Sequence, residues 1–235
     1  MIRTEKEGIV IIFAKAPDPG AVKTRLQPIL TVEERSGLQT ALLRDTLHLT
    51  DSLRQERALA CAPEVDHPFF VRCSRERPLS LVRQQGENLG ERMKNALAWG
   101  FGQRFRKVVL IGSDAPTLPA DFIQAAFDRL DRIPVVIGPS LDGGYYLIGA
   151  RPPLPDLFDG IGWGGDQVLV STLHKINAAK LDCHLLPFWY DIDRPNDLTF
   201  LKEQLDLLAR QGKPVPKETS EFLRTLSCFH DKAGR

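Results

Sequence analysis

The sequence predicts an α/β protein with a mostly parallel central sheet and helices on both of its faces, a three-layer α/β/α arrangement. Two observations predict it. Short runs of β-branched and other apolar residues alternate with longer amphipathic stretches along most of the chain, as in folds made of β–α–β units. Two of these runs, residues 8–14 and 107–112, are apolar at nearly every position, which is typical of strands buried on both faces.

The first elements follow from that alternation. A strand is expected over residues 8–14, and a loop rich in Pro and Gly follows over 15–28. Thr31 and Glu34 have the spacing of a capping box, in which each side chain accepts a hydrogen bond from the backbone N–H of the other residue. A helix is therefore expected from this point to about residue 53.

The remaining elements are inferred in the same way. Leu89, Met93 and Leu97 recur at the core spacing of a helix, and Pro119 and Pro195 stand where proline fits a first helical turn. The elements expected after the first helix are, in order, a strand over 57–62, one or two short strands within 66–81, a helix over 89–99, a strand over 107–112, a helix over 119–130, strands over 134–138 and 145–149, a helix over 165–176, a strand over 183–188, and helices over 195–209 and 218–229.

Composition predicts one globular domain over residues 1–235, because apolar residues make up 43% of the chain and no linker or repeat interrupts it. The 31 Lys and Arg nearly balance the 30 Asp and Glu, which argues against a surface built for nucleic acid or an anionic membrane. No run is long enough for a membrane span, and the four cysteines form no CxxC pair. A cytoplasmic protein without a disulfide framework is expected.

The loop after the first strand carries the first candidate site. Lys15, Lys23 and Arg25 supply positive charge for phosphate oxygens, and Gly20 permits backbone N–H groups to approach a ligand closely. The loop is not a Walker A motif, because Val22 stands where that motif requires glycine. The alternative is a solvated basic loop.

Asp114 follows the buried strand over 107–112 directly. Ligands of such sheets bind at the carboxyl ends of the strands, where a carboxylate can hold Mg²⁺ or Mn²⁺ together with ligand phosphates. Asp114 is therefore a candidate metal ligand. The alternative is that it caps the turn before the helix at Pro119.

A second pair of acidic residues precedes the helix that begins at Pro195. Asp191 and Asp193 would lie on the same side of an extended segment, and either one could be a second metal ligand. The alternative for Asp193 is that it caps the helix at Pro195, which leaves Asp191 as the better metal candidate.

The run Asp142-Gly143-Gly144 allows close backbone approach to a sugar or an acceptor, and Asp142 could accept hydrogen bonds from hydroxyl groups or act as a base. Equally, Asp-Gly is a strong signal for a hairpin turn. Gln85 and Gly86, before the helix at 89, are candidates for lining a base pocket.

Trp163 stands among three glycines, at 162, 164 and 165. A sugar or a base could stack on its ring, or the ring could anchor the loop to the core.

Four ordered motifs resemble a bacterial family of glycosyltransferase-A-like (GT-A) proteins labelled DUF2064. They are residues 13–17 with 23–26, residues 89–93, residues 112–116, and residues 138–139 with 142–149. The resemblance spans roughly residues 8–200 and implies the GT-A fold of nucleotide-diphospho-sugar transferases. It also implies a metal-binding role for Asp114.

Two features are similar to nucleotidyltransferases of the same fold, namely the basic loop and residues 191–198, which resemble a D-x-D-x-P-x-D-L ending. Two positions depart from the expected pattern. Ser113-Asp114 replaces the DxD of glycosyltransferases, and Gly165 stands where a hydroxyl residue is expected.

The sequence thus predicts a divalent-metal-dependent transferase that binds a nucleotide sugar and passes the glycosyl group to a small acceptor. One alternative is a nucleotidyltransferase that releases pyrophosphate, and another is a nucleotide-sugar sensor without turnover.

Overall fold

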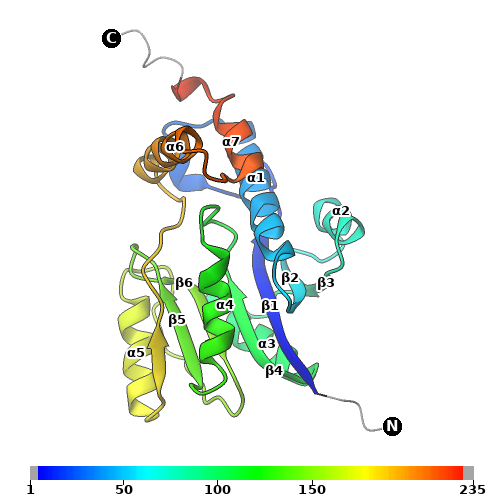
Figure 1. The fold of residues 1–235 in the computed structure, drawn as a ribbon, viewed down its shortest axis with the longest axis vertical. Coiled ribbons are helices and arrows are strands. Elements are labelled where there is room, and N and C mark those ends of the chain that lie inside the picture. The colour runs from blue at the N-terminus through cyan, green and yellow to red at the C-terminus, as the bar shows by residue number, and fades with distance from the viewer. Residues whose placement is uncertain (1–4, 230–235) are drawn as a thin grey trace.

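The computed structural model describes residues 5–229 and contains, within them, one seven-stranded sheet (Figure 1). The strands lie in the order β3-β2-β1-β4-β6-β5-β7. Their bounds are β1 (Lys6–Lys15), β2 (Glu56–Ala62), β3 (Ser80–Arg83), β4 (Phe105–Ile111), β5 (Val135–Pro139), β6 (Tyr145–Ala150) and β7 (Cys183–Leu185).

Helices cover both faces of this sheet. The helices are α1 (Val32–Asp51), α2 (Pro68–Glu76), α3 (Leu89–Gly102), α4 (Ala120–Arg129), α5 (Val168–Ala178), α6 (Pro195–Arg210) and α7 (Lys217–Leu223), with 3-10 turns η1 (Thr24–Leu26) and η2 (Ser227–Phe229). Leu47, Phe70 and Phe127, from α1, α2 and α4, belong to a first core cluster on one face of the sheet. Leu97 and Ile176, from α3 and α5, belong to a second cluster on the opposite face. The predicted three-layer α/β/α fold is confirmed.

The strand directions bring the candidate site together. β6 is antiparallel to both of its neighbours, β4 and β5, and every other neighbouring pair is parallel. The carboxyl ends of β1, β2, β4 and β5 therefore meet at one edge of the sheet. The loop after β1 and helices α6 and α7 gather beyond that edge (Figure 1).

A third core cluster fixes this loop to the end of the chain. Leu26 of η1 and Leu38 of α1 are fully buried against Leu201 of α6 and Leu223 of α7. In addition, Asp45 of α1 accepts hydrogen bonds from the backbone N–H groups of the first residues of α7. The C-terminal helices thus position the loop that follows the first strand.

Most expected elements are present, and the capping box of Thr31 and Glu34 opens α1 as predicted. The expectation of one or two short strands within 66–81 was wrong in part, because α2 precedes the single strand β3. The Nδ1 atom of His67 accepts a hydrogen bond from the Phe69 N–H, and Pro68 occupies the first turn. This cap begins a helix whose buried face packs on the sheet.

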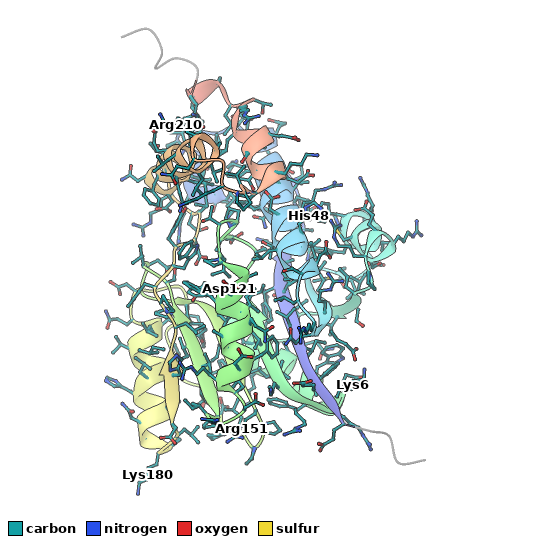
Figure 2. All side chains as sticks on the ribbon, in the orientation of Figure 1. Lys6, His48, Asp121, Arg151, Lys180 and Arg210 are labelled. Atoms are coloured by element: carbon teal, nitrogen blue, oxygen red, sulfur yellow. The ribbon has the colours of Figure 1, made fainter. Side chains whose placement is uncertain are left out.

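Two elements also end earlier in the chain than the sequence predicts. The strand expected over 183–188 ends at Leu185, two residues before Pro187, and the last helix ends at Leu223. Charged side chains such as those of Lys180 and Arg210 are exposed at the periphery (Figure 2). Among the described residues, no helix combines the length and the apolar character needed to cross a membrane.

Candidate active site

Three adjoining cavities follow the carboxyl edge of the sheet. The central cavity, about 440 Å³, lies between the loop after β1 and the end of β4. The β5-side cavity, about 610 Å³, shares Arg25 and Asp193 with it. The β2-side cavity, about 770 Å³, shares Lys15 and Gln84 with it. A ligand in the central cavity therefore has neighbouring space on both sides.

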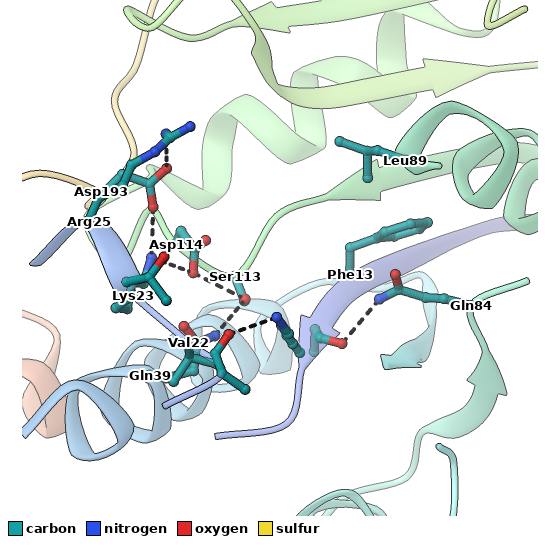
Figure 3. A pocket seen from close by; sticks show the side chains of 14 residues that line it. Phe13, Val22, Lys23, Arg25, Gln39, Gln84, Leu89, Ser113, Asp114 and Asp193 are labelled. Atoms are coloured by element: carbon teal, nitrogen blue, oxygen red, sulfur yellow. Dashed lines mark hydrogen bonds and ion pairs between the residues drawn. The ribbon is translucent and has the colours of Figure 1, made fainter. Parts of the chain in front are cut away.

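Lys23 is a buried residue in the wall of the central cavity (Figure 3). Its backbone is left-handed, with φ at 49° and ψ at 39°, which is uncommon for a residue with a Cβ and is often found at functional sites. Its side chain is only 2% exposed. The Nζ atom lies 2.9 Å from Oδ1 of Asp114 and 3.2 Å from Oδ1 of Asp193, and it donates to the Ile192 carbonyl at 2.7 Å.

The Lys23 ammonium thus has an oxygen acceptor for each of its three N–H groups. Burial lowers the pKa of this ammonium, but the carboxylates of Asp114 and Asp193 raise it, and the pKa lies above its ordinary value. Lys23 is consequently charged at neutral pH. It links two parts of the chain that are far apart in sequence.

A backbone hydrogen bond holds the two acidic segments beside each other, and an ion pair joins the second of them to the loop after β1. The Ile192 N–H donates to the Asp114 carbonyl at 2.9 Å, which joins the segment after β7 to the loop after β4. Asp193 also pairs with Arg25 at 3.4 Å. The alternative that Asp193 caps α6 is wrong, because the N-cap residue is Arg194 and Asp197 accepts from the backbone N–H groups at 193 and 194. The Asp193 carboxylate is therefore directed to the cations of the β1 loop.

Asp191 faces the β5-side cavity and accepts a hydrogen bond from Ser140 Oγ at 3.2 Å. Burial raises the pKa of its carboxyl to about 7, and the carboxylates of Asp114 and Asp142 add to the rise. A raised pKa means that the charged carboxylate is disfavoured here, so binding of a cation or a proton would relieve the unfavourable charge.

Asp142 belongs to the turn between β5 and β6, which pair as an antiparallel hairpin, so the hairpin interpretation of this run is confirmed. Its Oδ1 accepts from the Gly144 N–H at 3.0 Å, and its side chain lines the β5-side cavity. Gly143 has a φ of 90°, and a Cβ there would lie 2.1 Å from the Asp166 carbonyl oxygen. The turn therefore requires glycine for packing.

Lys15, Gly20 and Arg25 are the other candidate residues of the loop after β1. The Lys15 Nζ donates to the Ala21 carbonyl at 2.7 Å and lies on the border between the central and β2-side cavities. Gly20 has a φ of 79°, the left-handed region that favours glycine. Arg25 is exposed between the central and β5-side cavities.

Gln85 and Gly86 line the β2-side cavity, as does Gln84, which sequence reasoning missed. The Gln84 amide donates to the Ala14 and Ala60 carbonyls, at 3.1 and 2.8 Å, and so joins the ends of β1 and β2. The side-chain oxygen of Gln84 is left as an acceptor next to the central cavity. Its position directly after β3 was the only signal in the sequence.

Trp163 lies apart from the three cavities. Its ring stacks on Phe158 and meets Tyr145 edge-on, with centroids 6.2 and 6.5 Å apart. A Cβ added at Gly90 would lie 2.3 Å from its indole nitrogen, so the ring packs directly on α3. This packing favours the anchor role that the sequence left open.

The donor chemistry of the acidic residues fits a hard divalent cation. Mg²⁺ in phosphate-binding sites is usually held by one or two carboxylates together with ligand phosphates. Asp114 offers one carboxylate, and Asp191 or Asp193 offers a second. Within residues 5–229 no group of three or more His, Cys, Asp or Glu side chains is arranged to hold a metal ion by itself.

A family model described as "Uncharacterized protein conserved in bacteria (DUF2064)" matches residues 46–165, more than half of the chain. The chain belongs to the DUF2064 family. The predicted resemblance is thereby confirmed.

Other relatives of this DUF2064 protein carry transferase names. A 2-phospho-L-lactate guanylyltransferase of Methanobrevibacter ruminantium is 29% identical over 59% of the chain, and the match spans only 62% of that relative's length. A 3-phospho-D-glycerate guanylyltransferase of Colwellia psychrerythraea is 25% identical, and the match covers 88% of the chain and 95% of the relative.

Solved structures confirm the GT-A fold. A crystal structure from Desulfovibrio desulfuricans G20, provisionally assigned as a nucleotide-diphospho-sugar transferase, is 34% identical with a TM-score of 0.84 and covers 93% of this chain and 94% of its own. Glucosyl-3-phosphoglycerate synthase from Mycobacterium tuberculosis, solved with Mn²⁺ and UDP, is 13% identical with a TM-score of 0.53, covering 89% of this chain and 81% of its own. This second likeness shows the fold alone.

Proposed function

We propose that this protein is a nucleotidyltransferase that binds a nucleoside triphosphate in the central cavity and transfers its nucleoside monophosphate to a small acceptor. One observation carries the proposal, namely that two exposed cations, Lys15 and Arg25, line a single cavity beside the carboxylates that could hold Mg²⁺. A triphosphate carries more negative charge than the diphosphate of a nucleotide sugar and needs more cations around it. The guanylyltransferase names of two relatives support the same reaction and make GTP the first nucleotide to test.

Each group has a part in this reaction. An oxygen of the acceptor attacks the α-phosphorus, a new P–O bond forms, and the bond to the bridging oxygen of the β-phosphate breaks, so that pyrophosphate leaves. Lys15 and Arg25 would bind phosphate oxygens from the two ends of the central cavity. Gln85 and Gly86 would line the space for the base in the β2-side cavity.

Asp114, with Asp191 or Asp193, would hold a divalent ion, which would neutralise phosphate charge when bound. Asp142 would orient the acceptor or accept its proton from the β5-side cavity. Lys23 keeps the acidic segments together around this site.

Glycosyl transfer from a nucleotide sugar is the second candidate. The observation that favours it is the provisional assignment of the Desulfovibrio desulfuricans structure, which is the 34% identical relative. The two reactions differ in the product that leaves, pyrophosphate in one and nucleoside diphosphate in the other.

Product analysis tests the proposal. The protein would be incubated with Mg²⁺ and each of the four nucleoside triphosphates, and separately with UDP- and GDP-sugars, in the presence of a mixture of phosphorylated acids and sugar phosphates. Pyrophosphate release from a triphosphate that is lost in Asp114→Asn would support nucleotidyl transfer. Nucleoside diphosphate release from a sugar donor, without pyrophosphate release, would replace the proposal by glycosyl transfer.

A further inference from the structure

The β5-side cavity has features that a three-carbon acceptor would leave unused. Its volume of about 610 Å³ lies in the range of pockets that hold drug-sized molecules. The two guanylyltransferase relatives are named for phosphorylated three-carbon acids, which have far fewer atoms. The cavity adjoins the central cavity through Arg25 and Asp193, so its occupant would lie beside the phosphates.

One wall of the cavity is aromatic and apolar. Phe200 of α6 is 56% exposed, and its ring meets Tyr190 edge-on with centroids 5.1 Å apart. Tyr190 in turn stacks on Trp189, which fixes the pair. Leu141, in the turn after β5, is 72% exposed and lines the same cavity. A ligand with a ring face would cover this wall and bury its apolar area.

The polar groups of the cavity divide into two kinds. The carboxylates of Asp142 and Asp191 accept one hydrogen bond each, from Gly144 N–H and from Ser140 Oγ, and have further acceptor capacity for hydroxyl donors. Arg194 is exposed, and no ion pair engages its guanidinium among the described residues. Asp197, which also lines the cavity, is already bound to two backbone N–H groups.

We propose that the acceptor is a polyhydroxylated ring compound with an anionic group, such as a sugar phosphate or a sugar acid. Its hydroxyls bind Asp142 and Asp191, its ring packs on Phe200, and its anionic group binds Arg194. The proposal rests on the proposed function, because it names the substrate class of the same site. It also makes Phe200 and Arg194 specificity-determining residues.

Titration calorimetry of the protein loaded with Mg²⁺ and a non-hydrolysable triphosphate tests this proposal. The ligands are glucose 1-phosphate, glucose 6-phosphate, glucuronate, neutral glucose and 3-phosphoglycerate. We expect at least one sugar phosphate or the sugar acid to bind at least tenfold more tightly than glucose, which lacks the anion, and than 3-phosphoglycerate, which lacks the ring. Comparing the phosphates with glucuronate distinguishes the two sources of the anion.

Four variants locate the subsite. Phe200→Ala and Arg194→Gln should weaken binding of the sugar anion at least tenfold and leave triphosphate affinity unchanged. Leu207→Ala and Arg210→Gln are matched controls, because both residues are exposed on α6 but do not line the cavity. They should leave both affinities unchanged.

Tighter binding of 3-phosphoglycerate than of every sugar anion, or unchanged affinity in Phe200→Ala and Arg194→Gln, would overturn the proposal. If the wild type binds triphosphate but no ligand of this class, only the acceptor proposal fails. If it binds no triphosphate, the proposed function fails, and the same panel is titrated into the nucleotide-free protein. Sugar-anion binding that is weakened by the two variants would still support the subsite.

Discussion

At the scale of single residues, Lys23 joins the basic loop to the acidic residues of the site. The sequence identified Lys23, Asp114 and Asp193 as functional candidates. Their ion pairs could not be predicted, because the contact between Lys23 and Asp193 spans 170 positions and depends on the fold. The motif gave the residue types, and only the topology gave their partners.

Replacing Lys23 by Met tests the part of this cation in the ligand-free protein. Removing the ammonium leaves the carboxylates of Asp114 and Asp193 facing each other, and we expect a loss of roughly 1–3 kcal/mol of unfolding free energy, less than for a fully buried pair. Mg²⁺ without nucleotide should restore part of that lost stability, because the metal ion can bind between the two carboxylates in place of the missing ammonium. Thermal melts with and without Mg²⁺ measure both effects.

Lys15→Met is the control for this variant, because Lys15 is an exposed cation of the same loop with no ion pair to these carboxylates. We expect little change in its stability and no added response to Mg²⁺. Equal behaviour of the two variants would contradict the account of Lys23.

The raised pKa of Asp191 predicts that the stability of the protein depends on pH. Its pKa is about 7 in the folded chain and near the ordinary 3.8 when unfolded. Between these values the unfolded chain releases a proton that the folded chain keeps, so this residue makes folding less favourable as pH rises from 4 to 7. Asp191→Asn removes the effect and should stabilise the ligand-free protein by about 1–3 kcal/mol at pH 8, less than the full pKa difference would give, because the residue is only partly buried.

Denaturant titrations of wild type and Asp191→Asn between pH 4 and pH 8 check this expectation. The difference in unfolding free energy should grow from near zero at pH 4 and level off above pH 7. A difference that stays constant over this range would show that Asp191 does not titrate as described.

At the scale of elements, local signals predicted what local hydrogen bonds determine. The capping box of Thr31 and Glu34 opens α1 where expected. Helix α2 was missed because its cap is a histidine, and histidine is not among the common capping residues. The sequence also gave no sign that η1 packs on α6 and α7, since that contact joins the two ends of the chain.

That contact predicts an effect of Leu26 on ligand binding. Leu26 is fully buried between η1 and the C-terminal helices, so Leu26→Ala should reduce stability by roughly 2–5 kcal/mol. Because η1 carries Arg25 and follows Lys23, the variant should also bind triphosphate less tightly. Leu97→Ala is the control. Leu97 is the same type of residue and is also buried, but it lies on α3 in a different core cluster from that of Leu26.

Denaturant titration and nucleotide titration of both variants separate stability from affinity. We expect a similar loss of stability in both and weaker nucleotide binding, several-fold, in Leu26→Ala alone. Equal nucleotide affinities would mean that the third core cluster does not position the loop.

At the scale of the whole molecule, the alternation of strands and helices predicted the layered fold and the edge of the sheet at which the three cavities lie. The alternation could not predict the order of the strands in the sheet, because β6 lies between β4 and β5 and is antiparallel to both. This arrangement places the β5–β6 turn with Asp142 beside the segment of Asp191, so that both carboxyl groups line the β5-side cavity. Under the proposed function, the central cavity would hold the phosphates, the β2-side cavity the base and the β5-side cavity the acceptor.

The most direct test of this account is calorimetric titration of the wild type with GTP in the presence of Mg²⁺, compared with GDP-mannose and with the Arg25→Gln variant. We expect the triphosphate to bind at least tenfold more tightly than the nucleotide sugar, and we expect Arg25→Gln to remove most of this preference. Equal or tighter binding of the nucleotide sugar, unaffected by the variant, would contradict it.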